Sequence, residues 1–265
     1  MTRPKRAFPD DTPPILAPDL AKRRPKLVLP MGRGSRGKTM LCRWMIERAL
    51  DAGRVPVVAD GDRTNQSLAR SFSGVLSPPS ADDADVRAWI AGLVEALLTE
   101  RRDTVLDLGG GDLVLKGLAR EMDLLPWLTE LGVDLVAVHL IGPASDDMAF
   151  LQSVEEGSLL AAPATILVLN EGMVPPGRSP HAAFSATVQA HPILTATVIR
   201  GARVVSMPRL EPASEVEERG MTFVAASENQ VPGGQPPLGP WRAQQVAIWR
   251  RRMAEAFASV EEWLP

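Results

Sequence analysis

A chain of 265 residues, 45% of them hydrophobic and 23% charged, has the composition of a globular protein with room for one large domain or two small ones. Its single cysteine, Cys42, excludes an intramolecular disulfide and favours a cytoplasmic location. No apolar run approaches the roughly 18 residues of a spanning helix, and the basic start of the chain has no apolar signal segment. We therefore expect neither a transmembrane segment nor secretion.

Residues 1–25 are predicted to form a disordered, basic, proline-rich tail ahead of one folded domain over residues 26–265. Residues 1–26 hold seven Lys or Arg and three Asp, a formal charge of +4. Because the net charge of the chain is −3, the remainder carries −7. A basic arm can contact nucleic acid or an acidic partner, and a solvated leader is the simpler interpretation.

Short apolar runs alternate with helical patterns along the chain. The expected strands cover 27–31, 55–59, 104–108, 135–141, 165–169 and 202–207. The expected helices cover 38–52, 84–101, 113–131 and 144–160. Several apolar runs are nearly continuous Val, Leu and Ile, as strands buried on both faces should be. The alternation predicts an α/β fold of three layers, with a mostly parallel central sheet flanked by helices.

The segment between the first strand and the first helix matches a phosphate-binding loop. Residues 32–39 read Gly-Arg-Gly-Ser-Arg-Gly-Lys-Thr and fit the pattern G-x-x-x-x-G-K-[ST]. Glycines let the backbone turn its N–H groups onto phosphate oxygens, and the start of the helix adds its positive dipole end. In this pattern Lys38 bridges the β- and γ-phosphates and the Thr39 hydroxyl binds Mg²⁺. The expected fold is therefore that of a P-loop NTPase.

Acidic residues follow the next two expected strands. Asp60 and Asp62 come after the strand at 55–59, and Asp107 lies near the end of the strand at 104–108. Parallel strands bring their carboxyl ends to one edge of the sheet, so these acids should lie beside the phosphate-binding loop. Asp62 is placed to reach Mg²⁺ through water or to orient the attacking water, and Asp107 is placed to bind Mg²⁺.

Three further positions carry weaker signals. The glycine run at 109–111 permits movement of the chain, and Asp112 after it is either a helix N-cap or a second water-orienting acid. Asn170 follows the strand at 165–169, where its amide can hydrogen-bond a purine edge or belong to a turn.

The end of the sequence combines a linker with an amphipathic helix. Residues 228–240 are rich in Pro and Gly, and residues 241–264 have a helical apolar pattern. The apolar face consists of Val246, Trp249, Met253, Phe257, Val260 and Leu264. We expect this face to dock on the core, with dimer or membrane contact as alternatives.

Together these elements resemble the ParA/MinD family of deviant Walker ATPases. The loop at 32–39 is similar to the family's K-G-G-x-G-K-[ST] loop with its leading glycine, and residues 60–66 are similar to its D-x-D-P-Q segment. Asp107 matches the family's Walker B acid and Asn170 its adenine-reading Asn. Pro208 lies in a segment similar to its adenine-side loop. The resemblance extends over nearly the whole expected domain.

The sequence departs from the family pattern in two places. The signature Lys that reaches across the dimer is Arg33 here, and Arg suits bidentate phosphate contact, on its own nucleotide or on the partner's. The glycine run at 109–111 replaces the residues that usually follow the Walker B acid, which affects the expected coupling to a partner. A nitrogenase-type iron protein is not expected, because its bridging [4Fe–4S] cluster needs two cysteines per subunit and Cys42 is alone.

The resemblance implies an ATP-dependent homodimer that binds ATP and Mg²⁺ and hydrolyses ATP slowly until a partner protein stimulates it. Such proteins position or segregate cargo such as plasmids, and some bind DNA nonspecifically, although the charge of −7 argues against strong phosphate binding. The implied nucleotide-binding residues are Gly32, Arg33, Gly34, Ser35, Arg36, Gly37, Lys38, Thr39, Met40, Asn170 and Pro208. The implied catalytic residues are Lys38, Asp62 and Arg33, and the implied metal ligands are Thr39, Asp62 and Asp107.

Two other functions fit the same scaffold. A metabolic kinase or a ligase similar to dethiobiotin synthetase would need a second substrate pocket, for which the sequence shows no obvious constellation. A nucleotide-bound adaptor would hydrolyse little, so that Asp62→Ala would change nothing measurable. The sequence assigns no role to His139, His181 or His191.

Overall fold

The computed structural model describes residues 23–63, 66–109, 113–157, 160–230 and 236–265. Most of the expected tail, Gly110 and Gly111 of the glycine run together with Asp112, and part of the Pro/Gly linker lie outside these residues. The last residues of the expected tail are described: Arg23 pairs with Asp103 at 2.6 Å and Arg24 with Asp134 at 2.7 Å. The chain is therefore anchored to the folded body from residue 23 onward.

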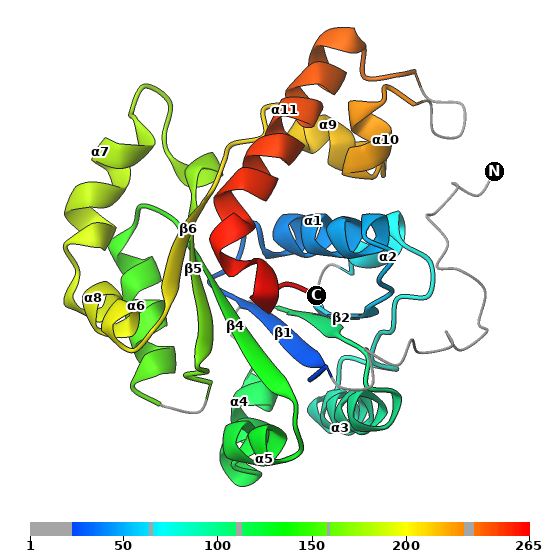
Figure 1. Ribbon diagram of the computed structural model, residues 1–265, viewed down its shortest axis with the longest axis vertical. Helices are drawn as coiled ribbons and strands as arrows, with labels where there is room; N and C mark the ends of the chain where they lie inside the picture. Colours follow the sequence, from blue (N-terminus) through cyan, green and yellow to red (C-terminus); the bar gives the residue numbers. More distant parts are fainter. Residues whose placement is uncertain (1–22, 64–65, 110–112, 158–159, 231–235) are drawn as a thin grey trace.

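Six parallel strands form one sheet in the order β2-β3-β1-β4-β5-β6 (Figure 1). The strands are β1 (Lys26–Met31), β2 (Val57–Gly61), β3 (Thr104–Leu108), β4 (Asp134–Ile141), β5 (Ala164–Asn170) and β6 (Arg203–Met207). Every expected strand is present, because a strand buried on both faces keeps a nearly continuous apolar sequence. The chain passes from β3 on one side of β1 to β4 on the other, which places the loop after β1 centrally at the carboxyl edge.

Helices cover both faces of the sheet (Figure 1). One face carries α1 (Lys38–Asp51), α2 (Leu68–Ser71), α9 (Ala213–Glu218), α10 (Phe223–Ser227) and α11 (Pro240–Phe257). The other carries α3 (Asp83–Glu100), α4 (Leu113–Glu121), α5 (Leu124–Glu130), α6 (Ser145–Glu155), α7 (Pro180–Phe184) and α8 (Pro192–Ile199). Short turns of helix are η2 (Glu171–Met173), η3 (Ser185–Gln189) and η4 (Ala258–Trp263). The prediction of a three-layer α/β fold with a mostly parallel sheet is confirmed.

Alternate residues of each strand enter different cores. Val28 faces the core beneath α1 and α11, whereas Leu27 and Leu29 face the core beneath α3 to α5. This alternation follows from the two-residue period of a strand. Among the described residues, no helix is both long and apolar enough to cross a bilayer.

The prediction of one helix over 113–131 is wrong. The structure has two helices there, α4 and α5, and Asp123 between them adopts a left-handed conformation with φ of 46°. Pro126 explains the break, because its ring would clash with the carbonyl of Met122 and it has no N–H to donate. The same proline is tolerated in the first turn of the new helix, α5.

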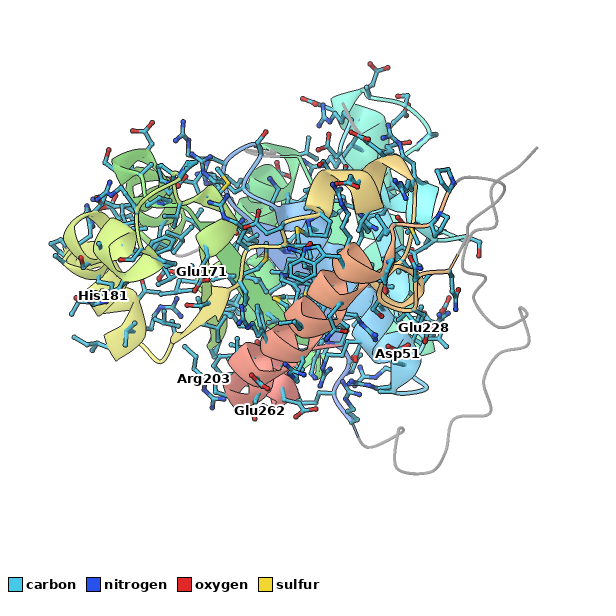
Figure 2. All side chains as sticks on the ribbon, turned by 90° about the horizontal axis from the view of Figure 1, so that it is seen from above. Asp51, Glu171, His181, Arg203, Glu228 and Glu262 are labelled. Atoms are coloured by element: carbon cyan, nitrogen blue, oxygen red, sulfur yellow. The ribbon has the colours of Figure 1, made fainter. Side chains whose placement is uncertain are left out.

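The last helix docks on the core as expected. The apolar side chains Val246, Trp249, Met253 and Phe257 of α11 are buried on the sheet face that also carries α1. Beyond α11 the chain tightens into the 3₁₀ turn η4 instead of continuing as one α-helix. Glu262 in this turn lies beside Arg203 on the edge strand β6, at 2.9 Å (Figure 2).

Candidate nucleotide-binding site

The loop between β1 and α1 has a backbone that requires glycine at both ends. Gly37, immediately before α1, has φ of +86°, and a Cβ atom there would lie 2.8 Å from Asn170 Nδ2. Gly32, immediately after β1, has φ of +150°, and a Cβ there would lie 2.8 Å from the carbonyl oxygen of Leu140. Positive φ and close backbone approach are both features that only glycine accommodates without strain. The loop thus curls tightly over the carboxyl edge of the sheet.

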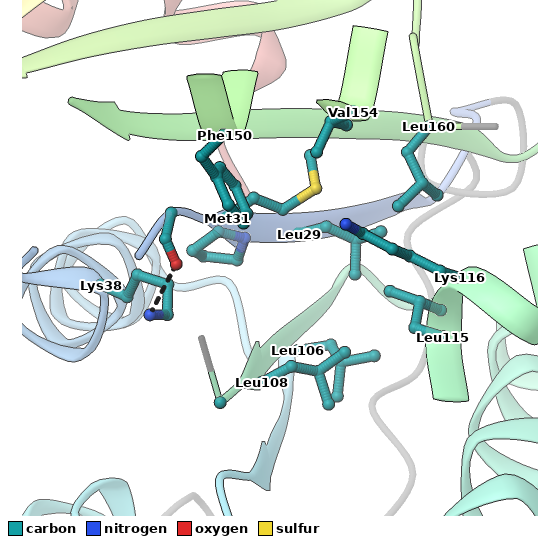
Figure 3. A pocket seen from close by; sticks show the side chains of 13 residues that line it. Leu29, Met31, Lys38, Leu106, Leu108, Leu115, Lys116, Phe150, Val154 and Leu160 are labelled. Atoms are coloured by element: carbon teal, nitrogen blue, oxygen red, sulfur yellow. Dashed lines mark hydrogen bonds between the residues drawn. The ribbon is translucent and has the colours of Figure 1, made fainter. Parts of the chain in front are cut away.

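Lys38 folds back across this loop. Its Nζ atom donates to the carbonyl oxygen of Gly32 at 3.2 Å (Figure 3). It also donates to the carbonyl oxygen of Arg33 at 3.3 Å. The side chain is 8% exposed. A cation held within the loop, beside the N-terminus of α1, makes the concavity attractive to an anion.

One buried acid contacts Thr39, and a second lies beside that acid on the neighbouring strand. Its hydroxyl donates to Asp107 Oδ2 at 2.8 Å. Burial raises the pKa of the Asp107 carboxyl to about 6, against the hydrogen bond from Thr39 that lowers it. Asp60, paired in register with Asp107 on the neighbouring strand, also has its pKa raised to about 6, mainly by burial. Because burial disfavours the ionised form of both carboxyls, a nearby cation would stabilise that form strongly.

Asp60 shapes the loop that carries Asp62. Its two carboxylate oxygens accept hydrogen bonds from the backbone N–H groups of Asp62, at 3.2 Å, and Leu68, at 3.0 Å. The Asp62 carboxylate is directed toward Gly109, where a Cβ atom would lie 3.8 Å from it. The structure therefore brings the three predicted metal-binding residues to one end of the sheet and adds Asp60 as a brace.

The oxygen groups near Thr39 fit Mg²⁺, which prefers oxygen ligands and usually takes only one or two carboxylates from the protein, with phosphates and water completing its shell. The hydroxyl of Thr39 and the carboxylate of Asp107 match that donor set. In the described part of the chain, no three acidic, His or Cys side chains converge on one metal position. The geometry thus suits a nucleotide-bound metal better than a cage built by the protein alone.

The two arginines of the loop are tied to the start of α6. Arg36 Nε contacts both carboxylate oxygens of Asp147, at 2.8 and 3.0 Å, and the same carboxylate accepts from the N–H of Gly142 at 2.9 Å. Arg33 lies 3.1 Å from Asp146 in a much more exposed pair, and 3.8 Å from the Asp147 carboxylate that Arg36 contacts. Neither Asp146 nor Asp147 was among the predicted site residues. Two adjacent Asp residues at the start of an expected helix could have indicated a contact with the loop arginines. The same pattern is equally typical of ordinary helix N-termini, which favour acidic residues.

Asn170 braces the loop from the neighbouring strand. Its Nδ2 atom donates to the Arg36 carbonyl at 2.9 Å, and its Oδ1 atom accepts from the N–H of Gly172 at 2.9 Å. Both ends of the amide are therefore engaged within the chain. Pro208 follows β6, and its carbonyl accepts from Trp249 Nε1 at 2.8 Å, which ties this segment to α11.

The remaining loop residues have little packing of their own. Around Gly34, a Cβ atom would meet nothing within 4 Å. Ser35 has φ of 58°, which turns the loop at its outer end. Met40, on the first turn of α1, is partly buried against the core beneath α11.

A small apolar pocket lies beside Lys38 (Figure 3). Its walls come from β1, β3, α4 and α6, and the Lys116 ammonium lies 5.4 Å from the ring centre of Phe150. The pocket has a volume of about 40 Å³. A single water needs at least about 10–15 Å³ on this measure, so the pocket has room for a few waters.

Comparisons with known proteins find resemblance at the level of structure. No family model matches the chain, and no curated protein matches its sequence. The MinD cell division protein of Aquifex aeolicus is similar over 88% of this chain and 97% of its own, with 12% identity and a TM-score of 0.49. Chloroplast FtsY from Physcomitrella patens is similar over 69% of this chain and 58% of its own, with 15% identity and a TM-score of 0.42.

The signal recognition particle receptor FtsY from Elizabethkingia anophelis, solved in complex with GDP, is similar over 69% of this chain and 57% of its own, with 15% identity and a TM-score of 0.40. The chain thus spans less than two thirds of either FtsY chain.

Proposed function

We propose that the protein binds ATP with Mg²⁺ and hydrolyses the γ-phosphate. The observation that carries this proposal is the 2.8 Å hydrogen bond between Thr39 and Asp107, at the mouth of a loop that also holds Lys38. A hydroxyl and a strand-end carboxylate in contact beside a phosphate loop are the protein ligands that P-loop NTPases use for Mg²⁺. When bound, the metal neutralises charge that develops on the phosphates.

Each side chain has one task in this proposal. Lys38 leaves the two loop carbonyls and bridges the β- and γ-phosphates, while the backbone N–H groups of the loop hold the phosphate oxygens. Asp62 orients the attacking water, and Asp60 holds the Asp62 backbone in place. Positioning of this kind supplies most of the catalysis in phosphoryl transfer, because the chemistry needs little covalent help from the protein.

We further propose a ParA/MinD-like switch in which ATP brings two copies of the chain together. In this switch, Arg33 is the cation that would contact the phosphates bound to the other copy of the chain. Its pair with Asp146 is 40% and 68% exposed on the two side chains, and pairs this exposed contribute only about 0–1 kcal/mol. Arg36, by contrast, holds an Asp147 side chain that is 1% exposed. Arg33 also lies 3.8 Å from Asp147, but Arg36 is the closer partner of that carboxylate, at 2.8 Å. Arg33 can therefore leave its two acids for a phosphate at a lower cost than Arg36 can.

The proposal includes a cytoplasmic setting, a partner protein that stimulates hydrolysis, and a cargo such as a plasmid. Nonspecific DNA binding belongs to the same proposal. If the dimer binds DNA through its basic side chains, the affinity must fall steeply as salt rises, because counterions are released from the phosphates. A flat salt response would remove DNA from the proposal and leave the switch intact.

A metabolic kinase is the weaker candidate on this structure. It needs an acceptor pocket next to the γ-phosphate, and the pocket that the described residues form there has a volume of about 40 Å³ and mostly apolar walls. A few waters fit such a space, but a metabolite does not. Among the described residues, the pocket offers Lys38 and Lys116 as its charged groups, and neither is an acid that could deprotonate an acceptor.

The test is the molar mass of the protein by light scattering on a sizing column, with ADP and with ATP plus Mg²⁺. We expect a monomer with ADP and a dimer with ATP, accumulated by Asp62→Ala, which slows hydrolysis. Lys38→Ala should abolish nucleotide binding, and Arg33→Ala should abolish the dimer.

Arg251→Ala is the matched control for Arg33→Ala, because Arg251 is an exposed arginine on α11 whose ion pair is with Glu255 of the same helix. It should behave as the unaltered protein does. A mass that ignores nucleotide, together with normal ATP binding, would reject the switch. Full hydrolysis by Asp62→Ala would reject the role of that residue.

A further inference from the structure

A second charged site lies at the opposite edge of the sheet. The loops that lead into β1, β2 and β3 surround a hollow of about 120 Å³, lined by Arg23, Arg54, Arg101, Arg102 and Asp103 among others. These loops are at the amino ends of the strands, so the hollow is separated from the P-loop by the length of the sheet. Nothing in the proposed ATPase cycle uses it.

Two of the four arginines are neutralised locally. Arg23 pairs with Asp103 at 2.6 Å, and the other oxygen of that carboxylate accepts from the N–H of Lys26 at 2.9 Å. Arg102 pairs with Glu100 at 3.2 Å. Asp103 is the acidic side chain that lines the hollow, and both of its oxygens are already engaged. Pro265 also lines the hollow, where a chain-end carboxylate would offset one of the remaining positive charges.

The other two arginines keep their charge unpaired. Arg101 donates to the backbone carbonyls of Leu131 and Gly132, at 3.0 and 2.9 Å, so its guanidinium is fixed in place without an acid. Arg54 forms neither an ion pair nor a side-chain hydrogen bond within the described residues. All five of its N–H donors are therefore available to a ligand.

The cations around this hollow repel one another. The pKa of the Arg54 guanidinium is lowered by burial and then by Arg48 and Arg23. The pKa of Lys26 is lowered to about 8, by burial first and then by Arg23, with Arg54 also lowering it. Asp103 and Glu261 oppose the shift at Arg54 but do not cancel it. Positive charge concentrated in a concave space is the arrangement that an anion relieves.

We propose that this hollow is a binding site for a phosphate monoester. A phosphate monoester carries about −1.5 to −2 charges at neutral pH and three acceptor oxygens, which match two unpaired guanidinium groups. The volume holds a phosphate group, whose few heavy atoms need much less than a 120 Å³ space, but the hollow is too small to admit a duplex. The group could belong to a phosphorylated metabolite or to the terminal phosphate of a nucleic acid.

The test is calorimetric titration of the Lys38→Ala variant with inorganic phosphate. Lys38→Ala removes the P-loop as a competing phosphate site, so this test does not depend on the proposed ATPase function. We expect saturable binding that weakens about tenfold or more in Arg54→Gln or Arg101→Gln, because each loses charge-assisted hydrogen bonds. Arg251→Gln, which removes an exposed arginine elsewhere, should not change the affinity.

Thermal unfolding without phosphate shows whether each variant is folded, so a loss of binding cannot be mistaken for a loss of structure. Titration with a sugar phosphate and with a short 5′-phosphorylated oligonucleotide, each beside its dephosphorylated form, identifies the source of the phosphate. The proposal is overturned if inorganic phosphate does not bind saturably to Lys38→Ala. It is also overturned if Arg54→Gln and Arg101→Gln bind phosphate as the parent does.

Discussion

Replacing His139 by leucine should stabilise the protein, and should do so more at pH 5 than at pH 7. His139 lies on β4 with 1% of its surface exposed, and neither ring nitrogen has a hydrogen-bond partner among the described residues. The nearest acid oxygen, on Glu155, is 3.9 Å away, and Arg200 engages that carboxylate at 2.8 Å. The imidazole is therefore a buried polar group that the fold does not satisfy, which costs about 1–3 kcal/mol.

The pH dependence follows from the charge on the ring. Burial, with a contribution from Arg200, lowers the pKa of His139 from 6.5 to about 3. Between those two values the unfolded chain binds a proton that the folded chain does not, so stability falls as the pH falls from 6.5 toward 3. At pH 5 the unfolded pKa lies 1.5 units above the pH. At about 1.36 kcal/mol per unit, this histidine removes roughly 2 kcal/mol of stability at pH 5.

The assay is urea unfolding of both proteins at pH 7 and pH 5. The informative quantity is the change between the two pH values, because any packing effect of leucine cancels in that difference. We expect His139→Leu to lose about 2 kcal/mol less than the parent on acidification. His181→Leu, at an exposed histidine on α7, is the control and should follow the parent. Equal losses in parent and His139→Leu would refute the reasoning.

Three further changes test other parts of the structure. Asp147→Asn should lower the free energy of unfolding by about 2–3 kcal/mol in urea, because it leaves the Arg36 guanidinium without its buried counter-charge; an unchanged midpoint would contradict this. Gly37→Ala should weaken nucleotide binding in a fluorescence titration, since the new Cβ would lie 2.8 Å from Asn170 at a positive φ; parent-like affinity would show that the loop adapts. Lys26→Met should abolish a rise in stability between pH 8 and 10.5, where the unfolded chain binds more protons because folding lowers the pKa of Lys26 to about 8; an identical pH profile would contradict it.

Much of the fold could be predicted because the apolar pattern of each strand agrees with its buried position in the sheet. Each expected strand lies within two residues of its observed bounds at either end, as the exact agreement at Thr104–Leu108 and the offset at Val57–Gly61 illustrate. The apolar period of residues 113–131 predicted one helix, but Pro126 cannot lie in the middle of a helix, so the segment forms α4 and α5. Short helices such as α9 and α10 were not predicted, since five or six residues contain too few turns to establish a period.

The candidate site was predictable where a motif defines it and not where contacts are long-range. The P-loop pattern and the strand-end position of Asp107 predicted that Thr39 and Asp107 would lie close together. The contact between Arg36 and Asp147 joins residues 111 positions apart, and no local pattern connects them. Likewise, the sequence placed Asn170 beside the loop but did not show that both ends of its amide are used to brace it.

The contact between the two ends of the folded body bears on how the chain is made. Lys26 in β1 donates to the carbonyl of Leu264 at 2.7 Å, across 238 positions, and Trp44 of α1 packs on Phe257 with ring centres 4.8 Å apart. At about 5–20 residues per second, a ribosome needs roughly ten seconds to a minute to reach that segment. Until then the apolar face of α1 and β1 has no cover. The nascent chain should therefore be a client of ribosome-associated chaperones until its last helix emerges.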